Sequence, residues 1–187
     1  MAEKQEEILK AALKLFVAFG FHATPTSKIA KEAGVANGTL FHYYKTKDDL
    51  ILALYTDVKL RLTEHMYVNV NKDDSLQEIF RTIFLNTVEW AQDHKEEYYF
   101  IQQFNMSPFL SLIPKEEITL QTKPSLDLIH SGIKNKILKP LPAEFLYSLF
   151  NSHIYGLSQY LFTTDLSAQK QKKVANDSFE MIWDLLT

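Results

Sequence analysis

The sequence predicts an all-α protein of about nine helices, and three observations support this fold class. Glycine (5) and proline (6) are scarce among 187 residues, whereas β-structure needs frequent turns. Apolar residues recur at three- and four-residue spacing through most of the chain, which is the period of an amphipathic helix. No segment sustains the apolar–polar alternation of a half-buried strand. Because 46% of the residues are hydrophobic, the helices can bury a sizeable core.

The N-terminal quarter predicts three helices separated by short breaks. Gly20 is placed to form the left-handed cap that ends the first helix. Thr26 and Asn37 are candidate N-caps of the second and third, because their side-chain oxygens can accept from free helical N–H groups. The helices expected here cover residues 3–19, 26–33 and 37–44.

The remaining helices are longer and carry wider apolar stripes. Thr46 and Asp49 form a variant of the capping box at the start of the fourth helix, and Pro124 predicts a kink or break within its helix. The helices expected in this part of the chain begin and end at about 46–70, 75–94, 96–107, 115–137, 143–163 and 167–186.

Charge is unevenly distributed along the chain. Residues 1–62 carry nine lysines and arginines against seven acids, whereas residues 63–187 carry eleven against sixteen. Between Thr24 and Lys47 there are four lysines and one acid, Glu32. A local basic segment on an acidic body suits contact with phosphate groups, although an ordinary solvated face would give the same small imbalance.

Several classes of protein are not expected. The chain has no cysteine, which rules out disulfides and thiolate metal sites and is compatible with the cytoplasm. The polar, acidic start does not resemble a signal peptide, and there is no run of eighteen apolar residues, so we expect no membrane partner. There is no phosphate-binding glycine loop or nucleophile-elbow glycine pattern, so we expect no cofactor and no enzyme activity.

Residues 26–44 fit a helix-turn-helix. Two short helices that cross steeply need a small residue at the crossing, which Ala30 supplies, and a residue that tolerates positive φ in the turn, which Gly34 supplies. Apolar side chains must fill the wedge between the helices, and Ile29, Val35 and Leu40 do so, together with Ala33. In such a motif the second helix is presented to the major groove of DNA.

At these positions the chain resembles the TetR family of transcriptional regulators. The resemblance covers residues 4–55 and implies a DNA-binding domain over residues 1–48, followed by a ligand-binding and dimerisation domain over 49–187. It further implies a homodimeric repressor that binds a palindromic operator and is released by a small molecule. The matching positions are Gly20-Phe21, Thr24, Thr26, Ile29-Ala30, Ala33-Gly34-Val35, Gly38, Leu40-Phe41, Tyr43-Tyr44, Lys47 and Leu50.

The second helix of the motif carries the candidate base-reading groups. Asn37, Thr39 and His42 can hydrogen-bond base edges, and Gly38, which has no side chain, permits a close approach. The family often has tyrosine where this chain has Phe41, so the contact expected there is apolar, for instance to a thymine methyl. The family usually has phenylalanine where this chain has Tyr44, which we expect to fill the small core with its hydroxyl outward.

A second set of polar residues is expected to hold phosphates and fix the register on DNA. The resemblance implies backbone contacts at three of these positions: Thr24, Tyr43 and Lys47. Thr26 could instead serve only as a helix cap, and Tyr43 could belong to the core. The full predicted set is Thr24, Thr26, Ser27, Lys28, Tyr43, Lys45 and Lys47.

The last two helices are the candidate dimer surface, as the resemblance implies. Small residues recur at four-residue spacing in the helix over 143–163, which allows a second helix to approach closely. The alternative is that these stripes only close the core of one chain. The dimer residues predicted are Ser148, Leu149, Ser152 and Gly156 in the first helix, and Phe179, Ile182 and Trp183 in the second.

An aromatic cluster between residues 90 and 109 is the candidate pocket for an apolar or amphipathic inducer. Small-molecule sites are commonly apolar with a few polar groups, but an aromatic stripe could equally be plain core. The predicted ligand residues are Trp90, Phe100, Gln103, Phe104, Met106, Phe109 and Tyr155.

Two other functions remain possible on the sequence alone. The chain could be a DNA-binding regulator that senses a protein partner, or a helical enzyme or binding module whose match over residues 4–55 is accidental. Asp127 and His130 have the spacing of half a metal site, but the sequence has no second such pair.

Overall fold

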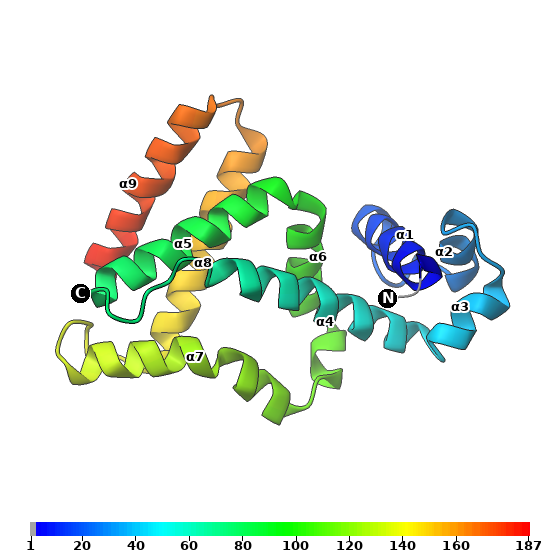
Figure 1. The fold of residues 1–187 in the computed structure, drawn as a ribbon, viewed down its shortest axis with the longest axis horizontal. Coiled ribbons are helices and arrows are strands. Elements are labelled where there is room, and N and C mark those ends of the chain that lie inside the picture. The colour runs from blue at the N-terminus through cyan, green and yellow to red at the C-terminus, as the bar shows by residue number, and fades with distance from the viewer. Residues whose placement is uncertain (1–2) are drawn as a thin grey trace. The chain divides into compact units, whose positions relative to one another are not determined.

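The computed structural model describes residues 3–187 and confirms the all-α prediction. Within these residues it contains nine α-helices, one 3₁₀ segment and no strand (Figure 1). The helices are α1 (Glu3–Phe19), α2 (Thr26–Glu32), α3 (Asn37–Tyr43), α4 (Lys47–Met66), α5 (Leu76–Asp93), α6 (Lys95–Asn105), η1 (Pro108–Leu112), α7 (Lys115–Lys134), α8 (Ala143–Thr163) and α9 (Ala168–Leu186).

The chain forms two compact units that do not follow simple sequence order. Unit 1 comprises residues 3–61 and 94–113, and unit 2 comprises residues 62–93 and 114–187. Unit 1 therefore extends past the predicted domain boundary at residue 48 and includes α6. Long-range packing, rather than position along the chain, decides which helices share an interior.

In unit 1, α1 packs against α2, α3 and α6. α1 ends at Gly20, whose φ of +76° is left-handed and whose N–H donates to the Phe16 carbonyl at 2.8 Å. This is the predicted glycine cap. The interior of the headpiece (α1 to the start of α4) is formed by side chains with no exposed surface, among them Ile8, Ile29 and Leu40.

The predicted helix caps have mixed outcomes. Thr46 and Asp49 form the expected reciprocal pair: the Thr46 N–H donates to Asp49 Oδ2 at 2.9 Å, and the Asp49 N–H donates to Thr46 Oγ1 at 3.0 Å. Thr26 and Asn37 were wrongly predicted as N-caps, because each is already the first helical residue. The cap positions belong to Pro25 and Ala36, which have extended backbones and no side-chain cap bond.

Aromatic side chains join α6 to α1 and α4 inside unit 1. The Phe100 ring lies 6.4 Å from Phe16 and 5.8 Å from Phe21, measured between centroids. Phe104 stacks on Tyr55 with centroids 3.9 Å apart. Edge and stacked ring contacts of this kind stabilise packing beyond the apolar area they bury.

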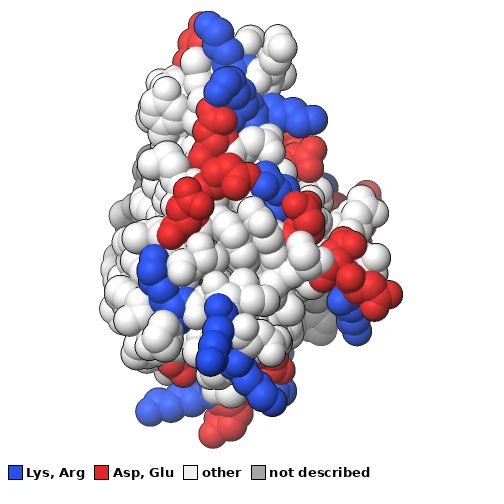
Figure 2. Space-filling view, turned by 90° about the vertical axis from the view of Figure 1, so that its left-hand side faces the viewer, with Lys and Arg blue, Asp and Glu red and all other residues white. Residues whose placement is uncertain are grey.

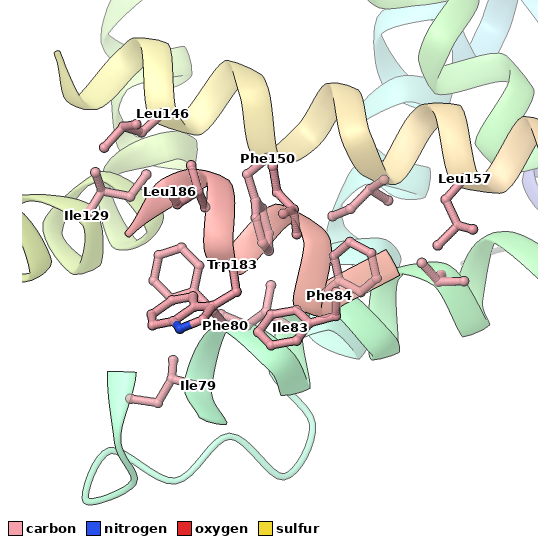
Figure 3. Close-up of a cluster of buried hydrophobic side chains, with 14 of the residues drawn as sticks. Ile79, Phe80, Ile83, Phe84, Ile129, Leu146, Phe150, Leu157, Trp183 and Leu186 are labelled. Atoms are coloured by element: carbon pink, nitrogen blue, oxygen red, sulfur yellow. The ribbon is translucent and has the colours of Figure 1, made fainter. Parts of the chain in front are cut away.

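Unit 2 has a core shared by α5, α7, α8 and α9 (Figure 3). Phe80 of α5 contacts Phe150 of α8 and Trp183 of α9, at centroid distances of 5.3 and 5.7 Å. Phe84 lies 5.6 Å from Phe179. These contacts bury the inward-facing apolar sides of α5 and α9.

The structure does not show the break predicted at Pro124, because α7 is continuous through it. Pro124 and Leu120, whose carbonyl would otherwise accept from residue 124, are both exposed, so water can satisfy that carbonyl. The only residues of α7 that are buried are Ile129 and Gly132, near its end. A Cβ on Gly132 would lie 2.6 Å from Leu138 Cδ1 and 2.7 Å from Leu76 Cδ2, so glycine is what permits this close packing.

Candidate DNA-binding site

The turn between α2 and α3 has the geometry that the sequence predicts. Gly34 has φ of +66°, a left-handed conformation in which a Cβ is unfavourable. The Val35 N–H donates to the Ala30 carbonyl at 2.9 Å, and the Gly34 N–H donates to the Lys31 carbonyl at 3.2 Å. This pair of bonds is a Schellman motif, which ends α2 and turns the chain into α3. Ala30 is buried, as a small residue at the helix crossing should be.

One face of α3 is presented to solvent. Asn37, Gly38 and His42 are exposed, Thr39 is half-buried, and Leu40 points into the interior. A Cβ on Gly38 would meet no atom within 4 Å, so the fold itself does not require glycine there. Phe41 is 37% exposed, which leaves its ring available for an apolar contact.

The predicted phosphate-binding residues are distributed around this face. Ser27, Lys28 and Lys45 are exposed, whereas Thr26, Tyr43 and Lys47 are half-buried. The Lys28 Nζ lies 3.5 Å from the centroid of the exposed Phe19 ring, a cation–π contact that holds the ammonium near the surface. Partial burial lowers the pKa of Lys47, and a phosphate beside it would oppose that shift.

Thr24 differs from the prediction. Its side chain is fully buried, and its hydroxyl donates to the carbonyls of Gly20 at 2.8 Å and Leu15 at 3.2 Å. These bonds satisfy carbonyls at the end of α1 and fix the α1–α2 connection. The predicted phosphate contact of this side chain is therefore wrong in this structure, because its hydroxyl faces the interior.

Tyr44 is buried, as predicted for a substitute for phenylalanine in the core. Its hydroxyl oxygen, however, is also buried, so the expectation that it points outward is wrong. Burial raises the pKa of this phenol, because the charged phenolate loses its hydration.

The lone acid of the motif is neutralised within the headpiece. Glu32 accepts from Lys14 Nζ at 2.5 Å, so its charge is offset close to the four lysines between Thr24 and Lys47. By contrast, the face of the molecule in Figure 2 intermixes basic and acidic side chains.

The predicted dimer residues separate into two groups. Ser148, Ser152 and Gly156 are exposed along α8 and Leu149 is half-buried, so this ladder is free to meet another surface. The three residues predicted on α9 are buried in unit 2 and were wrongly placed at the dimer surface: Phe179, Ile182 and Trp183. Their rings and methyl groups fill the core against α5 and α8.

Sequence reasoning missed other apolar groups on α8 and α9. Phe145 and Tyr160 of α8 are 50% and 48% exposed, and Met181 and Leu185 of α9 are 67% and 55% exposed. The signal was present in the four-residue spacing between Met181 and Leu185, which forms a second apolar stripe on α9. The other stripe of α9, which contains Phe179, Ile182 and Trp183, is richer in aromatic residues and packs in the interior.

The predicted ligand residues between 90 and 109 do not surround an open cavity in this structure. Phe100 and Phe104 are fully buried in unit 1, and Trp90 is 2% exposed in unit 2. Gln103 Nε2 donates to the Val17 carbonyl at 3.4 Å, and Met106 is 77% exposed. Phe109 lies 5.1 Å from Phe21, and Tyr155 is half-buried on α8. The buried aromatic rings fill the protein interior and do not line an open cavity.

Unit 2 contains a small apolar hollow elsewhere, between the end of α4 and helices α5, α7 and α8. Its volume is about 20 Å³, which is room for about one water molecule. The Tyr67 hydroxyl and Ser125 Oγ lie 3.2 Å apart beside it, and burial raises the pKa of Tyr147 in its wall. The lining residues are Met66, Phe80, Ile83, Ser125, Leu128, Ile129, Tyr147, Phe150 and Asn151.

Comparison with known proteins decides the family. Residues 8–54 match the family model for the DNA-binding part of bacterial regulatory proteins of the tetR family, and residues 55–186 match that of the tetracyclin repressor-like C-terminal domain. The chain belongs to the TetR family. It is therefore a DNA-binding transcriptional regulator of the TetR type.

Two proteins are similar to this TetR regulator over different shares of its length. A fatty acid metabolism regulator protein of Bacillus subtilis is 33% identical over 75 residues, which is 40% of this chain and 39% of that protein. A tetR family transcription regulator from Shewanella sp. PV-4, known as a crystal structure, is 27% identical with a TM-score of 0.88, covering 98% of this chain and 97% of that one.

A second solved structure shows how widely the fold of this TetR regulator is shared. The fatty acid degradation regulator FadR from Bacillus halodurans superposes with a TM-score of 0.76 at 16% identity, over 98% of this chain and 96% of that one. Within the described part of this TetR regulator, no helix has both the length and the apolar character needed to cross a bilayer.

Proposed function

We propose that this TetR regulator is a repressor that binds a palindromic operator as a homodimer and is released by an apolar or amphipathic small molecule. The observation that carries the proposal is the exposed face of α3, with Asn37, Gly38 and His42 directed to solvent after a tight Gly34 turn. A helix held in this way can enter a major groove.

The DNA-binding part is tested with Gly38→Ala. The added methyl group fits the free protein, because no atom lies within 4 Å of it, so the fold should be retained. It would occupy the space that a base edge needs. In a band-shift titration on a palindromic fragment from beside the gene, we expect binding at least about tenfold weaker. Unchanged affinity would contradict close approach at Gly38.

Phosphate contact by Lys47 is tested through salt dependence. Lys47→Ala should weaken binding to operator and non-operator DNA alike, and reduce the slope of log affinity against log salt by about one. Lys115→Ala is the matched control, because Lys115 is an exposed lysine at the start of α7 in unit 2. Equal slopes for wild type and Lys47→Ala would reject this contact.

The dimer is proposed to use the exposed ladder of α8 together with the second apolar stripe of α9. Two like-charged side chains facing each other across a close helix contact repel each other strongly. Gly156→Glu should therefore convert the dimer to monomer in sedimentation velocity, whereas Ser131→Glu on the exposed side of α7 should leave it unchanged. A dimer that survives Gly156→Glu would exclude this surface.

The ligand is proposed to enter the apolar hollow of unit 2, in place of the aromatic cluster first predicted. Its wall combines apolar side chains with Ser125, Tyr147 and Asn151, a composition that suits a chain with one polar end. The fatty acid regulators of B. subtilis and B. halodurans that resemble this chain point to fatty acids and their derivatives as the first class to test.

Because the hollow holds about one water molecule, a longer ligand must open it. Such a ligand shifts DNA affinity only if it prefers the opened state to the DNA-binding state. We expect a long-chain acyl compound to abolish the band shift, and Ile83→Trp to block this release without weakening DNA binding. Release that persists in Ile83→Trp would place the ligand elsewhere, and failure of all acyl compounds would favour a regulator that senses a protein partner.

A further inference from the structure

A second and larger hollow lies in unit 2, between the end of α5, the last turns of α8 and the first turns of α9. Its volume is about 460 Å³, within the range of about 300 to 1,000 Å³ typical of small-molecule sites. Its residues are Leu85, Val88, Glu89, Gln92, Asp93, Leu161, Ala168, Gln171, Lys172, Ala175 and Asn176. None of them lines the smaller hollow described above.

The walls of this hollow divide by chemistry. Leu85, Val88, Leu161 and Ala175 form an apolar part that continues from the core of unit 2. The charged groups come from two helices, with Glu89 and Asp93 on α5 and Lys172 on α9.

The carboxylates of Glu89 and Asp93 lie where the electrostatics of α5 are unfavourable to negative charge. Glu89 and Asp93 are four residues apart, so they lie on one face of α5 and repel each other. Both occupy the last turns of α5, where the partial negative charge of the helix end disfavours anions. His65 Nε2 lies 3.7 Å from Glu89 and offsets its charge only when the imidazole is protonated. An ammonium group in the hollow would relieve this repulsion.

The hollow also presents hydrogen-bond donors. Gln92 Nε2 is buried and has no hydrogen-bond partner among the described residues. A buried donor without an acceptor is unfavourable, and an acceptor on a ligand would satisfy it. The Lys172 ammonium lies on the α9 wall of the same hollow. A carboxylate is the group that can accept hydrogen bonds from both donors together.

We propose that this hollow binds a small zwitterion of the amino-acid type with an apolar side chain. Its ammonium would meet Glu89 and Asp93, its carboxylate would meet Gln92 and Lys172, and its side chain would cover the apolar part. This site is distinct from the acyl site of the proposed function. It does not depend on that function, because binding can be measured without DNA.

L-Leucine is the probe for this proposal, with two compounds that each lack one charge. We expect calorimetric titration of the full chain to show L-leucine binding at least about tenfold tighter than 3-methylbutan-1-amine or 4-methylpentanoate, since each loses one set of charge-assisted bonds. The side-chain amide signals of Gln92 should shift in NMR spectra. Equal binding of the amine alone, or of the carboxylate alone, would overturn the zwitterion assignment.

Two variants test the contacts. Asp93→Asn and Lys172→Gln should each weaken L-leucine binding about tenfold. Their matched controls are Asp127→Asn and Lys173→Gln, whose parent residues are exposed, lie outside the hollow and pair with Lys123 and Asp177 instead. No binding of L-leucine, or equal losses in the variants and controls, would overturn the proposal.

Discussion

The interiors of the two units are made of similar residues but are packed differently. In unit 1, Phe16, Phe100 and Phe104 are fully buried in a cluster of ring contacts. In unit 2, Phe84 and Phe179 are equally buried, yet hollows of about 20 and 460 Å³ lie at the margins of the core. The difference teaches that aromatic content indicates burial but does not by itself indicate where space for a ligand lies.

The largest test of this comparison removes one ring from each interior. Phe100→Ala should reduce the free energy of unfolding by about 3 to 5 kcal/mol, because the closed cluster cannot collapse around the cavity. Phe150→Ala should have a smaller effect, since Phe150 already borders a hollow. Urea denaturation measures both, and an equal or larger loss for Phe150→Ala would remove the distinction between the interiors.

The next test concerns Gly132, whose lack of a side chain allows close packing in unit 2. A methyl group on Gly132 would overlap Leu138 and Leu76, and overpacking of this kind costs about 1 to 3 kcal/mol. Gly132→Ala should therefore lower the thermal midpoint. Gly38→Ala is the control, because its methyl group meets open space, and a neutral result for Gly132→Ala would show that the two leucines move aside easily.

Glycine serves a different purpose in unit 1. Gly34 has open space around its Cβ position but a φ of +66°, so Gly34→Ala should destabilise by about 1 kcal/mol through backbone strain alone. Asparagine tolerates this conformation better, so Gly34→Asn should recover part of the loss in the same denaturation assay. Identical losses for alanine and asparagine would argue against a conformational cause.

The last test concerns the pH dependence of stability in unit 1. Burial lowers the pKa of the Lys59 ammonium in the folded chain, so the unfolded chain binds more protons between the lowered and ordinary pKa values. Stability should therefore rise with pH across that window, by at most about 1.4 kcal/mol per pH unit. Lys59→Met should flatten this rise in alkaline urea titrations, whereas exposed Lys115→Met should not. Parallel profiles for wild type and Lys59→Met would contradict the linkage.

The features that sequence predicts best are local ones. The Gly34 turn, the Gly20 cap and the Thr46–Asp49 pair each depend on residues within about one helical turn, so backbone sterics and nearby hydrogen bonds determine them. Thr26 and Asn37 were misplaced by one residue, because extended Pro25 and Ala36 can occupy the cap position without a side-chain bond.

The features that sequence missed depend on distant neighbours. Thr24 has a hydroxyl suited to a phosphate, but the turn after α1 brings it within reach of the carbonyls of Leu15 and Gly20. On α9, the residues at 179, 182 and 183 and those at 181 and 185 form two apolar stripes. Only the packing of α5 and α8 decides which stripe lies inside.

The ring contacts between α1 and α6 limit how freely the headpiece can be transplanted. A chimeric regulator that borrows only residues 1–55 would bring Phe16 and Phe21 without Phe100, their partner from α6. Grafts between relatives should therefore carry residues 94–113 as well, even though these lie in the segment that family comparison assigns to the C-terminal domain.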